Sequence, residues 1–100
     1  MAYKIIWSPE AIDSFDSIID YLRSRFTERE VAKFVNIVNR RLLLIEKFPQ
    51  TAGKVSKTSG RRKAVIHKRT ILIYKILERK RTAELLIFFD TRQYPRRLKF

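Results

Sequence analysis

Basic side chains are the most abundant candidates for chemistry in this chain of 100 residues, and they gather in its second half. Residues 1–50 hold 8 basic and 7 acidic residues, whereas residues 51–100 hold 15 basic and 3 acidic ones. A surface that is charged for solubility alone mixes both signs. The imbalance therefore predicts a binding surface for a polyanion, either the phosphates of a nucleic acid or an acidic segment of a protein.

Few side chains are suited to proton transfer. His67 is the only imidazole, and the spacing of the carboxylates provides it with no clear partner. If the chain cleaves RNA, it must do so without a metal, with the 2′-hydroxyl as nucleophile and with arginine or lysine stabilising the charge on the phosphate. Because arginine keeps its proton at neutral pH, the conceivable proton carriers are Lys54, Lys63, Lys68, His67 and Tyr94.

Several chemistries are excluded by the residues that the chain lacks. It has no cysteine, which rules out disulfides, zinc fingers, iron–sulfur sites and a thiol nucleophile. It has no phosphate-binding loop, dinucleotide fingerprint or nucleophile elbow. The helically spaced Asp13, Asp16 and Asp20 fall on the polar face of a predicted helix, which disfavours two-metal nuclease chemistry. We expect no metal and no cofactor.

The length and hydropathy of the chain predict one domain, residues 1–100. No run of 18 apolar residues and no secretory signal pattern is present, so we expect a cytoplasmic protein without a membrane partner.

The first half of the chain predicts one strand and two helices. Residues 2–7 are rich in β-branched and aromatic types. Ser8-Pro9-Glu10 has the cap, first-turn proline and acidic residue that begin a helix, and apolar residues recur after it at three- and four-residue steps. Thr27 and Glu30 form a capping box for a second helix, which Pro49 ends. Since almost no linker separates the helices, we expect an antiparallel hairpin.

The second half predicts a loop and three strands. Residues 50–61 contain both glycines and no apolar period, as a long loop does. Three β-like runs follow, over residues 62–67, 70–77 and 83–89, with turns of two and five residues between them. The last run is apolar at consecutive positions, so we expect a central strand that is covered on both faces. Residues 90–100 form a polar, basic tail.

The predicted fold class is α+β with the order β-α-α-β-β-β. We expect the helical hairpin to pack on one face of a small, mainly antiparallel four-stranded sheet. The opposite face then carries most of the basic side chains.

Five short sequences, in this order and spacing, carry a family resemblance. They are Ile6-Trp7-Ser8-Pro9-Glu10-Ala11, Asp20-Tyr21-Leu22, Phe48-Pro49 followed by Gly53, Ile73-Tyr74-Lys75-Ile76, and Phe89-Asp90-Thr91-Arg92-Gln93-Tyr94-Pro95. Together with the order of elements, they resemble the RelE/ParE superfamily of toxins from bacterial type II toxin–antitoxin systems over nearly the whole chain. Many members of this superfamily are known as plasmid-stabilisation proteins.

The resemblance implies a small toxin that a cognate antitoxin holds inactive by wrapping an acidic segment over it. It also implies one of two targets, because the RelE branch cleaves mRNA in the ribosomal A site and the ParE branch inhibits DNA gyrase. We expect the antitoxin groove to lie across the hairpin and the sheet, with acidic antitoxin side chains meeting the basic half.

Three positions bear on the choice of target. The ribonuclease branch has an arginine three residues before the strand tyrosine, and counting back from Tyr74 this place is Ile71. Its second arginine matches Arg92. Its later tyrosine corresponds to Tyr94, which comes too early, or to Leu98 at the nearer spacing. We therefore favour a ParE-like gyrase inhibitor; the alternatives are a ribosome-dependent mRNA endoribonuclease and a non-toxic basic module that binds nucleic acid.

The expected binding residues are basic side chains of the second half: Lys54, Lys57, Arg62, Lys63, Lys68, Arg69 and Arg92. We place Arg62, Lys63 and Arg92 at the centre of this surface and Tyr94 at its rim. If the chain is a ribonuclease, Arg92, Arg62 and Tyr94 are the expected catalytic residues.

Overall fold

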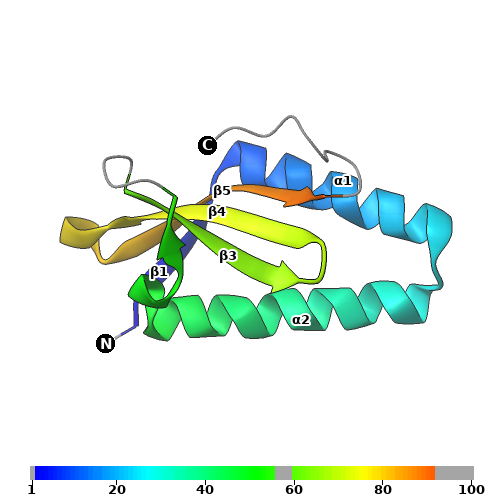
Figure 1. Cartoon of the computed structure of the whole chain (residues 1–100), viewed down its shortest axis with the longest axis horizontal. Helices are drawn as coiled ribbons and strands as arrows, with labels where there is room; N and C mark the ends of the chain where they lie inside the picture. The colour runs from blue at the N-terminus through cyan, green and yellow to red at the C-terminus, as the bar shows by residue number, and fades with distance from the viewer. Residues whose placement is uncertain (1, 56–59, 92–100) are drawn as a thin grey trace.

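The computed structural model describes residues 2–55 and 60–91 (Figure 1). The elements are, in order, β1 (Lys4–Trp7), α1 (Pro9–Arg25), α2 (Glu28–Lys47), the 3-10 turn η1 (Pro49–Thr51), β2 (Gly53–Lys54), β3 (Arg61–His67), β4 (Thr70–Leu77), the 3-10 turn η2 (Glu78–Lys80) and β5 (Thr82–Asp90). The predicted α+β order is confirmed, and one short strand is added to it.

Both helices begin at the predicted caps. The Ser8 Oγ accepts a hydrogen bond of 3.0 Å from the Ala11 N–H, and the Thr27 Oγ1 accepts one of 3.3 Å from the Glu30 N–H. These bonds satisfy backbone donors that the first turn of a helix leaves without partners. Two residues, Phe26 and Thr27, lie between α1 and α2, and the helices run antiparallel (Figure 1).

The described strands form one five-stranded sheet in the order β1-β5-β4-β3-β2. The predicted count of four strands was wrong, because Gly53–Lys54 pairs with β3 as a two-residue strand within the segment that we expected to be a loop. A strand of two residues that includes a glycine is too short to show the alternation of apolar and polar residues by which strands are predicted. The β1–β5 pairing is parallel and the other three are antiparallel, which agrees with a mainly antiparallel sheet.

One face of the sheet packs against both helices. The buried cluster joins helix residues such as Ile18 and Val38 to Leu72, Tyr74 and Phe88 of the sheet. Three aromatic rings extend the cluster at the start of α1, since the centroid of Phe88 lies 5.2 Å from that of Trp7 and 5.3 Å from that of Phe15. Aromatic contacts of this geometry add stabilisation beyond the apolar area that they bury.

The last strand was expected to be central and covered on both faces; it is internal and buried on both faces, although β4 occupies the centre of the five strands. β5 lies between β1 and β4, and Phe88 and Phe89 are both buried although consecutive residues of a strand point to opposite faces. Within the described residues, neither helix is long and apolar enough to cross a membrane.

Candidate functional site

The sheet has a second face, which points away from the helices, and we call it the outer face. Ala64, Leu72 and Tyr74 belong to the helix-side core, so their strand neighbours Lys63, Ile73 and Lys75 project to the other side. Strand register places the remaining members. On β3, β4 and β5 the outer face is made of Arg61, Lys63, Val65, Ile71, Ile73, Lys75, Leu77, Thr82, Glu84, Ile87 and Phe89. β1 adds Lys4 and Ile6.

The charged residues of the outer face gather towards one of its ends. Arg61 lies opposite Lys75, which in turn lies opposite Glu84, and Lys63 follows Arg61 by two residues on β3. We call Arg61, Lys63 and Lys75 the cationic end. Towards the other end, Val65, Ile71 and Phe89 lie opposite one another in a wholly apolar row.

The cationic end combines one like-charge pair with one opposite-charge pair, Lys75 and Glu84. Like charges that lie directly opposite each other in antiparallel strands destabilise a sheet, and Arg61 and Lys75 are such a pair. Arg61 and Lys63 are exposed, whereas Lys75 is half-buried on an internal strand. β3 and β4 add no acidic residue to this face, because the sequence from residue 47 to residue 77 contains nine basic residues and no acidic one. Among the described residues, the acidic member of this face is Glu84 on β5.

Arg62 projects to the opposite side from Lys63. Its guanidinium donates hydrogen bonds of 3.0 Å to the Gln50 carbonyl and 2.7 Å to the Ala52 carbonyl. Its partner across the strands, Tyr74, donates through its hydroxyl to the Pro49 carbonyl. Burial raises the pKa of Tyr74 above its ordinary value, and the positive charges of Arg62 and Arg41 oppose this shift.

The structure therefore distributes the predicted binding residues over several places. Lys63 lies at the cationic end, while Lys54 lies opposite Arg62 on the edge strand β2. Lys68 and Arg69 form the two-residue turn between β3 and β4, at the other end of the hairpin from Arg61.

Three predicted site residues, Lys57, Arg92 and Tyr94, lie outside the described residues. The Thr91 N–H donates to the Arg69 carbonyl at 2.7 Å, so the described chain ends beside the β3–β4 turn.

Two members of the cationic end, Arg61 and Lys75, were absent from the predicted set. The two-residue period of strands could have found them. Arg61 and Lys63 are alternate residues of one run, and Lys75 interrupts the apolar series Ile73 to Leu77 at a position that shares a face with both of those residues.

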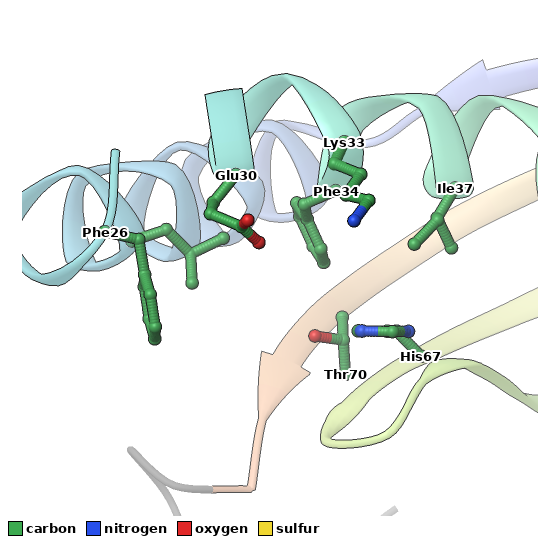
Figure 2. A pocket seen from close by; sticks show the side chains of 8 residues that line it. Phe26, Glu30, Lys33, Phe34, Ile37, His67 and Thr70 are labelled. Atoms are coloured by element: carbon green, nitrogen blue, oxygen red, sulfur yellow. The ribbon is translucent and has the colours of Figure 1, made fainter. Parts of the chain in front are cut away.

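An apolar pocket of about 270 Å³ opens between the helical hairpin and the β3–β4 turn. Figure 2 shows Glu30, Lys33, Phe34 and Ile37 projecting from α2 on one side and His67 and Thr70 on the other. Leu22 and Phe26, from the end of α1, complete the lining. His67, the candidate proton carrier, thus faces Lys33 across an apolar pocket. Within the described residues, no three carboxylate, imidazole or thiol groups come together as they do around a metal ion.

Solved structures with this fold define its class. A chain described as the chromosomal ParDE toxin–antitoxin system from P. aeruginosa superposes with a TM-score of 0.73 at 15% identity, covering 89% of this chain and 96% of that one. The RelBE2 toxin–antitoxin complex from Mycobacterium tuberculosis gives 0.63 at 14% identity, covering 90% and 99%. A mutant of the E. coli toxin RelE in the free state gives 0.63 at 13% identity, covering 95% and 90%. The fold is thus that of proteins from type II toxin–antitoxin systems.

The family follows from the sequence. A comparison with curated proteins finds no match. The family model described as ParE toxin of type II toxin-antitoxin system, parDE, matches residues 5–94. The chain belongs to this family, and the RelE/ParE resemblance is confirmed.

Proposed function

We propose that this toxin of a type II toxin–antitoxin system inhibits growth through DNA gyrase in the cytoplasm. The observation that carries the choice of target is the apolar row of Val65, Ile71 and Phe89. The resemblance places a catalytic arginine of the ribonuclease branch at the position of Ile71. The ParE family membership supports the same choice.

The chemistry of RNA cleavage explains why this row matters. Without a metal, attack by a 2′-hydroxyl needs a cation to stabilise the charge that develops on the phosphate and a group to move the proton. Valine, isoleucine and phenylalanine supply neither. Within this row Phe89 is buried and Val65 is exposed, so Val65 is the apolar side chain that the row offers to a protein partner.

The experiment compares both targets with one preparation of the protein. A supercoiling reaction contains purified gyrase, relaxed plasmid and ATP, and a purified bacterial translation reaction contains a defined mRNA. We expect loss of supercoiling with intact mRNA. Ribosome-dependent cleavage of the mRNA with normal supercoiling would instead establish the endoribonuclease alternative, and the absence of both effects would favour a non-toxic binding module.

We further propose that a cognate antitoxin docks on the pocket between the hairpin and the β3–β4 turn. The similar M. tuberculosis structure is described as a toxin–antitoxin complex. The pocket offers apolar walls from Phe26, Phe34 and Ile37, with Lys33, His67 and one acidic residue, Glu30, beside them. Lys68 and Arg69 follow His67 directly. This combination suits an amphipathic antitoxin segment with one apolar anchor and acidic neighbours.

A further inference from the structure

We propose that the cationic end of the outer face, Arg61, Lys63 and Lys75, binds the phosphodiester backbone of duplex DNA without reading its sequence. This inference rests on the proposed function, because it supplies a second contact for a toxin that acts on a DNA-bound enzyme. It concerns binding to DNA itself, which can be measured without gyrase.

The first argument is the segregation of charge. The acidic residues Glu10, Asp13, Asp16, Asp20, Glu28, Glu30 and Glu46 all lie on α1 or α2. The helices cover the opposite face of the sheet, so these carboxylates lie away from the cationic end. A polyanion that approaches the outer face therefore meets an excess of positive charge, as nucleic acids do on the proteins that bind them.

The second argument is the cost of the arrangement. Arg61 and Lys75 are directly opposite, and Lys75 occupies a half-buried position on a strand whose neighbouring outer-face residues are Ile73 and Leu77. An apolar residue at position 75 would continue the pattern and remove the repulsion from Arg61, but it would also remove the opposite-charge pairing with Glu84. An anionic ligand that contacts both Arg61 and Lys75 would offset their mutual repulsion.

The spacing of the three cations suits a phosphate backbone. Alternate residues of a strand lie about 6.7 Å apart, and directly opposite residues about 5 Å apart, so the cationic end presents an array of separate charges. An acidic protein segment would in addition need an aromatic or large apolar anchor at the centre of the contact. Among the described residues of the outer face, the exposed large apolar side chains are Val65 and Ile6, and Ile6 lies opposite the acidic Glu84. Contacts to a phosphate backbone require charge and no such anchor.

Duplex DNA fits better than a single strand. Proteins that hold single strands stack bases on exposed aromatic rings. The aromatic residue of the described outer face is Phe89, which is 4% exposed and thus unable to stack on a base. The face is therefore suited to an intact duplex, whose bases are already stacked.

The experiment measures the anisotropy of a labelled 30-base-pair duplex of arbitrary sequence at several KCl concentrations. The double variant Lys63→Gln/Lys75→Gln is compared with Arg40→Gln/Lys47→Gln, a matched control that removes the same charge from exposed positions of α2. Three phosphate contacts predict a slope of about −2.7 for log K against log salt. We expect the double variant to bind at least 10-fold more weakly, with a slope reduced in magnitude by about 2. We expect the control to change binding less than 2-fold.

Several outcomes would overturn the proposal. Equal losses in the two double variants would mean that only net charge matters. Tighter binding of single-stranded RNA of the same length would exclude the duplex as ligand. Tighter binding of polyglutamate, weakened by Lys63→Gln/Lys75→Gln, would assign the cationic end to an acidic protein. The single variant Lys63→Gln at an exposed position, expected to reduce the slope by about 1, keeps the test valid if the change at Lys75 prevents folding.

The two proposals can fail separately. Specific DNA binding with unaffected gyrase would contradict the proposed function and leave this inference standing. If the protein inhibits gyrase but its cationic end does not bind duplex DNA, the proposed function stands and this inference is contradicted.

Discussion

Arg62 and Tyr74 stand opposite each other on β3 and β4, and both donate hydrogen bonds to backbone carbonyls of residues 49–52. This segment follows α2 directly and leads into β2. The two side chains therefore attach the end of the helical hairpin to the centre of the sheet. A second set of contacts supports the same turn, because the Gln50 Nε2 and the Tyr3 hydroxyl both donate to Glu78 Oε1, at 3.3 Å and 3.1 Å.

Arg62→Ala is expected to lower the free energy of unfolding by about 2 kcal/mol, because hydrogen bonds from a charged donor contribute about 1.5–3 kcal/mol. Lys54→Ala, at the exposed partner position on β2, should cost less than about 0.5 kcal/mol. Urea unfolding followed by circular dichroism compares the two. Equal stabilities would show that the Arg62 bonds do not hold residues 49–52, and would make this side chain available for the binding role predicted from the sequence.

The raised pKa of Tyr74 predicts that the folded protein loses stability at high pH. Because burial raises its pKa in the folded protein above the value in the unfolded chain, the folded state holds the phenolic proton more tightly. This stabilisation is complete below the unfolded pKa, about 10, and is lost as the pH rises through the folded pKa. Tyr74→Phe should cost about 1–3 kcal/mol at neutral pH, since the Pro49 carbonyl loses its donor. Unfolding free energies of both proteins between pH 8 and 11 test this, and parallel curves would contradict it.

Phe26→Glu should weaken antitoxin binding about 30-fold, as expected for loss of an apolar anchor worth about 2 kcal/mol. Phe26 lines the pocket and is 44% exposed, while Phe48, on the other end of α2, is 56% exposed and does not line it. Phe48→Glu is therefore the matched control. Titration of each variant with the cognate antitoxin gives the affinities, and thermal unfolding checks that both variants stay folded. A larger loss with Phe48→Glu would place the antitoxin on a different surface.

Ser8→Ala should cost about 1–2 kcal/mol. The hydroxyl caps α1 through the Ala11 N–H and also donates to the Leu86 carbonyl at 3.1 Å, so one side chain joins the helix to β5. Ser24→Ala removes an exposed hydroxyl that bonds within α1 to the Tyr21 carbonyl, and it should cost less than about 0.5 kcal/mol. Thermal unfolding compares the stabilities of the two variants. Equal melting temperatures would contradict the dual role of Ser8 as the cap of α1 and as a link to β5.

The helices and the longer strands could be predicted because local chemistry determines them. Ser8 and Thr27 act as caps within their own turns, and Pro49 ends α2 wherever the rest of the chain lies. The pairing of β1 with β5 depends on residues far apart in the sequence, so no local pattern indicates it. β2 was missed because pairing with β3, and not its own composition, makes Gly53–Lys54 a strand.

The candidate site was harder to predict because sequence neighbours do not share a face. Arg62 and Lys63 are adjacent and were expected together, yet one bonds residues 49–52 and the other joins the outer face. Irregularities between Val65 and His67 and between Ile73 and Tyr74 shift the alternation further along these strands. Alternation alone therefore places Lys63 and Lys75 correctly but not every residue of the hairpin.

The parallel pairing of β1 with β5 also determines when this protein can fold. Synthesis produces β1 first, but β1 pairs with β5, and the Ser8 hydroxyl bonds to the Leu86 carbonyl, which lies 78 residues later in the chain. Such long-range contacts form slowly, since a long loop must close before they stabilise anything. A nascent chain that stops before β5 lacks both the partner of β1 and the buried Phe88. A fragment released before β5 is made therefore lacks the contacts that complete this fold.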